Sequence, residues 1–178
     1  MKLESFKKYY FLEDYLFREI NNNFSKNHYL SNEEFFAIVI WKRNASKTKI
    51  FNGVKKSGKT IKEITESLYK EKDREKRIDI LMQTQGVGIS FASAILTVCF
   101  PKEFTIADYR ASASLKNLGY EVKGDPTTKV SVYFDYLDKC KKLAEQEKLS
   151  LRNLDRCLWG YDFYKGKNGL KELAEGLN

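Results

Sequence analysis

The chain has 178 residues, of which 42% are hydrophobic and 14% aromatic, so it can bury one core of ordinary size and leaves little room for a second domain. We therefore expect a single globular domain over residues 1–178. Its 32 Lys and Arg residues exceed its 24 Asp and Glu residues, and the net charge of +8 favours a polyanionic partner such as nucleic acid. The alternative is a lysine-rich surface that only keeps the protein soluble.

Membrane, secretory and metal-dependent classes receive no support from the sequence. The longest nearly apolar run, residues 89–100, is too short to span a bilayer, and the N-terminus lacks the pattern of a secretory signal. We expect a cytoplasmic protein, most simply a monomer. The odd number of widely spaced cysteines (Cys99, Cys140 and Cys157) and the single histidine, His28, predict no disulfide framework, no metal site and no cofactor.

The first part of the chain is patterned for helices. Apolar residues recur at helical spacing over residues 3–20, and the run Asn21–Asn23 predicts the end of that helix. A capping box at Ser31–Glu34 precedes the apolar run 35–41, which predicts a largely buried helix. The β-rich composition of residues 38–41 also allows a strand.

The middle of the chain continues in the same way. A second capping box at residues 60–63 predicts a helix over 61–69, and apolar spacing predicts another over 74–84. Residues 108–118 have a capping aspartate, a helical body and a terminating glycine, Gly119.

Helical signals extend to the C-terminus. Asp125-Pro126 predicts the start of a long helix, residues 150–159 predict a helix that closes at Gly160, and residues 170–177 predict a last short one. The expected fold is therefore all-α, an orthogonal bundle of about eight or nine helices with short connections.

A turn with two glycines, Gly86-Val87-Gly88, separates two of these predicted helices. The glycines permit a tight turn, and the helix that begins at Ile89 offers unpaired N–H groups and a positive dipole end to a phosphate. The alternative is a corner that only packs. Asp108 follows Gly88 by twenty residues, beyond a helix rich in small residues and Pro101.

This order of parts resembles the helix-hairpin-helix superfamily of DNA glycosylases, most closely over residues 81–118 and with a core of about 35–118. The resemblance implies a helix-hairpin-helix motif and a duplex DNA partner. It also implies that the hairpin amides hold the phosphate backbone, through Gly86, Gly88 and Ser90, with Gln85 before them. Asp108 would then stabilise positive charge on the sugar and position or activate water. As an alternative, Asp108 is an excellent helix N-cap.

The resemblance extends to the end of the second predicted helix. Trp41 falls where family members carry the segment that enters the duplex, so it is a candidate for the base pocket or for a wedge; ordinary burial is the alternative. Lys42 and Arg43 are candidates for phosphate contacts, although a solvated loop also explains them.

The sequence departs from the family at several positions. Ser90 stands where members that cleave the backbone carry a Schiff-base lysine, Gln85 replaces the usual proline, and Ala113 replaces an arginine for which Arg110 is a candidate substitute. The sequence also lacks a four-cysteine iron-sulfur loop. We therefore expect base excision repair chemistry of a monofunctional DNA glycosylase, which hydrolyses the N-glycosidic bond of a damaged, modified or mispaired base without lyase activity. The alternative is a non-catalytic DNA-binding module.

One competing motif predicts an NTPase. Gly53–Thr60 matches the G-x-x-x-x-G-K-T loop of nucleotide hydrolases. That loop requires a buried strand before it, and residues 47–52 make a poor central strand. Thr60 as an ordinary helix cap explains the same residues, so this is the remote alternative.

Overall fold

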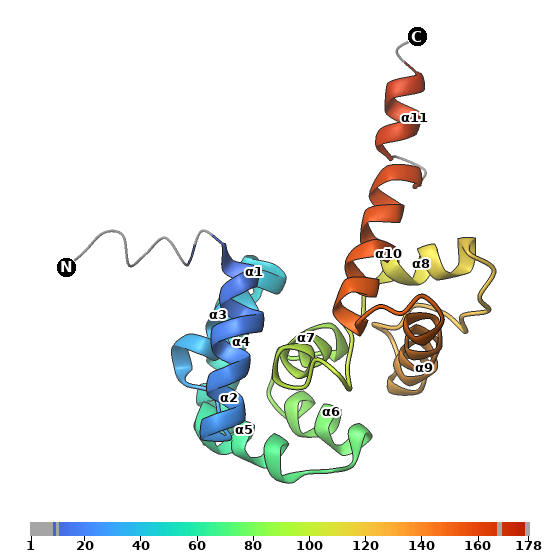
Figure 1. Ribbon diagram of the computed structural model, residues 1–178. Helices are drawn as coiled ribbons and strands as arrows, with labels where there is room; N and C mark the ends of the chain where they lie inside the picture. The colour runs from blue at the N-terminus through green and yellow to red at the C-terminus, as the bar shows by residue number, and fades with distance from the viewer. Residues whose placement is uncertain (1–8, 10, 167–168, 177–178) are drawn as a thin grey trace. The chain divides into compact units, whose positions relative to one another are not determined.

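The structure, a computed structural model, describes residues 9, 11–166 and 169–176. Its regular elements are helices, and the described ranges contain no strand, which confirms the predicted all-α class (Figure 1). None of the helices in this part of the chain is both long and apolar enough to cross a membrane.

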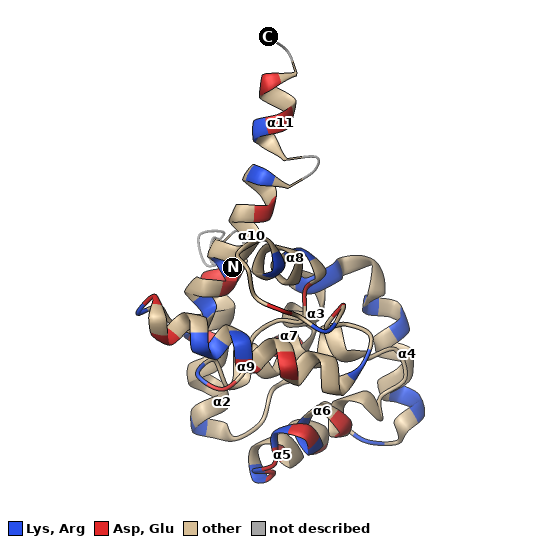
Figure 2. Cartoon of the chain, turned by 90° about the vertical axis from the view of Figure 1, so that its right-hand side faces the viewer, with Lys and Arg blue, Asp and Glu red and all other residues tan. Residues whose placement is uncertain are grey.

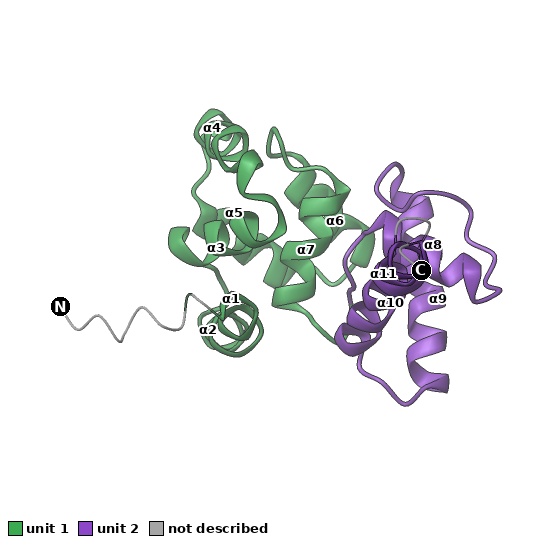
Figure 3. Ribbon diagram, turned by 90° about the horizontal axis from the view of Figure 1, so that it is seen from above, with its two compact units in different colours: residues 1–103 green, residues 104–178 purple. Residues whose placement is uncertain are grey.

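The chain divides into two compact units, residues 1–103 and residues 104–178 (Figure 3). The predicted turn at Gly86-Val87-Gly88 belongs to unit 1, whereas Asp108 belongs to unit 2. The family-like core of 35–118 therefore draws on both units, and each unit is described by itself below.

Unit 1 contains most of the helices. They are α1 (Leu12–Asp14), the π-helical segment η2 (Tyr15–Ile20), α2 (Asn21–Asn27), α3 (Asn32–Arg43), the 3-10 turn η3 (Asn44–Ser46), α4 (Lys47–Ser57), α5 (Ile61–Lys70), α6 (Arg74–Met82) and α7 (Ile89–Cys99). α7 lies at the centre of the unit, with residues 92–99 buried, and it packs against α2, α3 and α6. This unit is therefore built around the helix that follows the glycine turn.

The predicted stop at Asn21–Asn23 is wrong, because these residues lie inside a helix that continues to Asn27. The Asn21 side chain is taken up by tertiary structure, since its Nδ2 donates to the Val98 carbonyl at 2.7 Å. The helix ends instead at His28, which adopts the left-handed conformation with φ 66°. Residues 3–8 and 10 of the predicted first helix lie outside the described residues.

The apolar run after the first capping box forms helix α3 and not the alternative strand. Ser31 accepts from the Glu34 N–H, and Glu34 accepts in return from the Ser31 N–H, which completes the predicted capping box. Its residues Phe35, Ile38 and Val39 are buried. Capping and burial together favour the helix over β propensity.

α4 is a helix that the sequence did not lead us to expect. It covers residues 47–57 and ends at Gly58, whose φ of 67° is left-handed. Gly53 therefore lies inside a helix, and Thr60 is the N-cap of α5 with its own capping box to Glu63. The phosphate-loop pattern of 53–60 forms a helix end, a turn and a helix start, and no strand precedes it.

Unit 2 contains α8 (Tyr109–Asn117), α9 (Val130–Gln146), α10 (Leu151–Lys165) and α11 (Leu170–Glu175). The predicted cap at Asp108 and the glycine after α8, Gly119 with φ 89°, are confirmed. Residue 177 of the last predicted helix lies outside the described residues.

Two predicted boundaries in unit 2 are wrong. Asp125-Pro126 does not start α9, because the Asp125 carboxylate accepts from the Thr127 N–H at 2.8 Å and closes a separate turn. α10 also passes through Gly160 to Lys165. An isolated glycine is tolerated within a helix at modest cost, so Gly160 is not a stop.

Buried side-chain hydrogen bonds fix the segment that leads to α8. The Tyr133 hydroxyl donates to the Thr105 carbonyl at 2.8 Å, and the Ser114 hydroxyl donates to the Leu158 carbonyl at 2.7 Å. The first bond anchors residues 104–107 on α9, and the second joins α8 to α10. Asp108 therefore begins its helix from a well-anchored segment.

Candidate functional site

The α6–α7 turn, residues 83–88, contains the two glycines singled out in the sequence. The Thr84 N–H donates to the Leu81 carbonyl and the Val87 N–H to the Thr84 carbonyl, both at 3.0 Å. Gly86 has a φ of 94°, in the region where a side chain is strained. The first glycine is therefore required by the turn itself.

One side of the α6–α7 turn is covered by α4. A Cβ added to Gly53 of α4 would overlap the Gln85 carbonyl oxygen, and one added to Gly86 would lie 3.1 Å from Cγ of Lys49. Such close approach of helix and turn needs glycine on both surfaces. Gln85 and Gly86 thus have packing roles that the sequence did not reveal.

The other end of the turn is open. Gly88 is the N-cap of α7, is exposed, and a Cβ added there would meet nothing within 4 Å. Its carbonyl accepts from the N–H groups of Phe91 and Ala92, but no side chain caps the helix. The first amides of α7, near Gly88 and Ser90, are the part of the turn suited to an external acceptor.

A polar hollow of about 460 Å³ adjoins the same turn. Its polar lining comes from Ser57, Lys59 and Ser67 on one side and from Gln83 and Thr84 on the other. Hydroxyls, an amide and an ammonium group are suitable donors for phosphate oxygens.

The other predicted DNA-contacting residues of unit 1 lie at the end of α3. Trp41 is half-buried and packs edge-on against Phe17 of η2, with 5.7 Å between ring centroids. Lys42 is half-buried and Arg43 is exposed. Arg43 is thus accessible to a phosphate, whereas part of the Trp41 side chain serves packing.

In unit 2, Asp108 caps α8 as predicted. Its Oδ1 accepts from the Arg110 N–H at 2.9 Å, and the side chain is half-buried. The hydroxyl of Tyr136 is buried nearby, and its described polar neighbour is the thiol of Cys140, a weak hydrogen-bond partner. Burial raises the pKa of Tyr136, as do the neighbouring Cys140 and Asp155, and Asp108 also contributes to this shift. The carboxylate therefore lies between a dry interior and the surface.

An exposed aromatic surface lies next to Asp108. We call it the α8–α10 aromatic surface, formed by Tyr109, Arg110, Trp159 and Phe163. Trp159 and Phe163 are stacked at 5.6 Å, and the Arg110 guanidinium lies 5.9 Å from the centroid of the Trp159 ring. Tyr109, Trp159 and Phe163 are 59%, 45% and 52% exposed.

Arg110 is held in this surface by its neighbours. Its Nε donates to the Tyr109 hydroxyl at 3.0 Å and lies 3.9 Å from the Asp162 carboxylate. The sequence pointed to Arg110 as a candidate substitute for a missing arginine, but not to Trp159 or Phe163. Their spacing of four residues on one helix face, away from Leu154 and Leu158, is the signal that could have found them.

The remaining candidates have structural roles. His28 is exposed and stacks on Tyr69, Cys99 and Cys140 are buried free thiols, and Cys157 is an exposed one. The described residues contain no cluster of three or more His, Cys, Asp or Glu side chains placed to hold a metal ion.

Comparison with known proteins gave no match: no family model fits the chain, and neither a curated protein nor a solved structure is significantly similar to it.

Proposed function

We propose that this chain binds duplex DNA and is a monofunctional DNA glycosylase of the helix-hairpin-helix type. The single observation that carries the proposal is the position of the Asp108 carboxylate beside the α8–α10 aromatic surface, within one unit. Glycosidic cleavage needs a fixed negative charge near the developing oxocarbenium ion, and the base must leave the stack for a site where it can be stacked again. Asp108 would supply the charge, and the α8–α10 aromatic surface would stack the displaced base.

Unit 1 contributes the binding part of the proposal. The uncapped N-terminus of α7 at Gly88 would accept a backbone phosphate, and Lys59 and Arg43 would add charge. Ser90 has no amine, so it would form no Schiff base and the strand would not be cut. Hydrolysis would leave an abasic site.

The test is base release from duplexes that carry a panel of damaged, modified and mispaired bases. Strand breaks are expected only after alkali treatment, and Asp108→Asn is expected to lower their rate at least ~100-fold, as for loss of a catalytic acid-base group. Asp125→Asn is the matched control, because it makes the same change at a unit 2 carboxylate that also accepts a backbone N–H, in a turn, and it is expected to keep full activity. Absence of release across a broad panel would contradict the glycosylase proposal.

A non-catalytic DNA-binding module is the second candidate, and one observation favours it. The Asp108 carboxylate already has a structural use as the cap of α8, which by itself accounts for an aspartate there. In this case duplex binding would persist, would fall with increasing salt, and would not depend on Asp108. Binding of wild type and Asp108→Asn at several salt concentrations, together with the release assay, separates the two candidates.

A further inference from the structure

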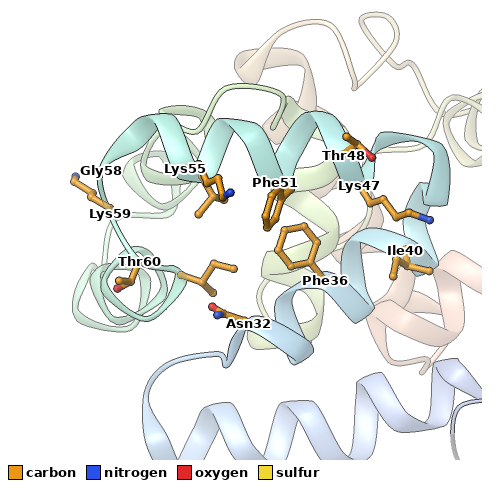
Figure 4. Close-up of a pocket in the computed structure, with 12 residues that line it drawn as sticks. Asn32, Phe36, Ile40, Lys47, Thr48, Phe51, Lys55, Gly58, Lys59 and Thr60 are labelled. Carbon is orange, nitrogen blue, oxygen red and sulfur yellow. The ribbon is translucent and has the colours of Figure 1, made fainter.

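An apolar groove of about 710 Å³ lies between α3, α4 and the start of α5 in unit 1 (Figure 4). We call it the α3–α4 groove; its apolar lining consists of Phe36, Ile40, Phe51, Val54 and Ile61. Phe36 and Phe51 point toward one another, with ring centroids 6.0 Å apart. Phe51 is 45% and Ile40 41% exposed, so the groove leaves large apolar side chains in contact with water.

The charges around the α3–α4 groove have one sign. Every ionisable side chain that lines it is a lysine: Lys47, Lys55 and Lys59. The Lys55 ammonium lies 4.8 Å from the centroid of the Phe51 ring, at the edge of the apolar floor, and Lys47 donates to Asn44 Oδ1 at 2.8 Å. A ligand with carboxylates beside an apolar surface would be complementary to this arrangement.

The groove is separate from the α6–α7 turn. Successive residues of a helix are rotated by about 100°, so Phe51 and Lys55 lie roughly opposite Lys49 and Gly53, the residues of α4 that contact the turn. α4 carries four lysines, at 47, 49, 55 and 56, and no acidic residue (Figure 2). Lys59 lines both this groove and the polar hollow beside the turn, so Phe51 and Lys55 are the residues that test the groove alone.

We propose that the α3–α4 groove binds an acidic amphipathic helix of a partner protein. The Thr60 hydroxyl at the rim already pairs with Glu63, and the apolar floor offers no hydrogen-bond partners to base edges or to an extended backbone. A helix satisfies its own backbone hydrogen bonds, so it needs only apolar anchors at i, i+3, i+4 and i+7 for such a floor. Lys47 and Lys55 are separated by about 12 Å along α4, which matches carboxylates two helical turns apart.

The test is fluorescence anisotropy with the full chain and a labelled peptide of about 16 residues, with leucines on one helical face and glutamates flanking them. Saturable binding is expected. A scrambled peptide of the same composition and a peptide with lysines in place of the glutamates are expected to bind at least tenfold more weakly. Lys55→Glu should weaken the acidic peptide at least tenfold and strengthen the basic one.

Lys56→Glu is the matched control, because it makes the same charge change on α4 outside the groove lining and should change binding less than twofold. Equal binding of the scrambled peptide, or equal loss in Lys55→Glu and Lys56→Glu, would overturn the proposal. Two other results would also overturn it. In the first, the peptide does not bind, and oligo(dT) binds to wild type but not to Phe51→Ala. In the second, sedimentation shows a dimer of the wild-type chain that Phe51→Ala dissociates.

Discussion

The N-termini of α7 and α8 meet the same backbone requirement in different ways. At α8, Asp108 supplies its own acceptor and bonds the Arg110 N–H at 2.9 Å. At α7, Gly88 has no side chain to offer, although three neighbouring helices in unit 1 receive side-chain caps from Ser31, Thr60 and Asp73. A side-chain cap satisfies one of the free N–H groups at a helix start, whereas an uncapped start leaves all of them for solvent or for a ligand.

The comparison separates the two kinds of glycine in the α6–α7 turn. Gly86 is needed for a positive φ and for close contact with α4, so it is explained by folding alone. Gly88 has an extended conformation with open space around it, and any residue would fit. Folding therefore explains why residue 86 is a glycine but not why residue 88 is one.

The largest expected effect is at Gly53, where α4 meets the turn. In an ordinary helix Gly→Ala is stabilising, but here the new Cβ would overlap the Gln85 carbonyl, so Gly53→Ala should destabilise the protein by about 3 kcal/mol. Gly160→Ala in α10 is the control, since its Cβ would meet nothing within 4 Å and should stabilise by about 0.5–1 kcal/mol. Urea unfolding of both variants measures the difference. A Gly53→Ala protein that is more stable than wild type, like Gly160→Ala, would show that α4 does not pack tightly on the turn.

The next effect concerns the support of Asp108 by α9. Tyr133→Phe removes a buried hydrogen bond to the Thr105 carbonyl and leaves that acceptor unpaired, at a cost of about 1–2 kcal/mol. Tyr136→Phe removes a buried hydroxyl whose described neighbour is only the weakly hydrogen-bonding Cys140 thiol, so it should cost less than Tyr133→Phe or be neutral. Thermal unfolding of the two variants makes the comparison. A similar loss in both would show that the Tyr136 hydroxyl is hydrogen-bonded.

The cap of α8 is expected to matter less for stability than for the proposed chemistry. Asp108→Ala should cost about 1 kcal/mol, while Asp108→Asn should cost less because asparagine is an equally good N-cap. In denaturant unfolding, the free energy of unfolding of Asp108→Asn should therefore be close to that of wild type, and that of Asp108→Ala should be lower. An Asn variant as unstable as Ala would mean that the charge of Asp108, and not its capping bond, supports the fold.

Local signals predicted much of this fold. The capping boxes at Ser31 and Thr60 and the aspartate cap at residue 108 each mark a helix start that depends on neighbouring residues alone. Predictions failed where tertiary contacts override local preference. Asn21 lies mid-helix because Val98 accepts its side-chain hydrogen bond, and α4 forms although no side chain caps its start and Gly53 interrupts its sequence.

The candidate site was predictable only in part. Asp108 and Gly88 are visible because spacing and residue type mark them, and their roles stay predictions. The roles of Gln85 and Gly86 in packing depend on α4, which is more than thirty residues earlier in the sequence and carries no signal of that contact. Trp159 and Phe163 join Arg110 only through the packing of α10 on α8, which sequence periodicity does not specify.

The smallest effect on stability gives the sharpest test of the uncapped terminus. Gly88→Ser supplies a hydroxyl cap at an open position, so it should raise the free energy of unfolding by a few tenths of a kcal/mol. If the α7 amides bind a DNA phosphate, the new cap would compete with it. Duplex affinity should then fall several-fold without any change in net charge, and Gly88→Asp should lower it further through charge repulsion.

Asn52→Asp is the matched control for charge, because it adds a negative charge to an exposed residue of unit 1 that belongs neither to the α7 terminus nor to the polar hollow. Its effect on duplex affinity should be smaller than that of Gly88→Asp at every salt concentration. A Gly88→Ser protein that gains stability and keeps its full affinity for DNA would show that the terminus is filled only by water. Gly88 would then be one tolerated residue among several, and phosphate binding would have to be assigned to Lys59 and Arg43 alone.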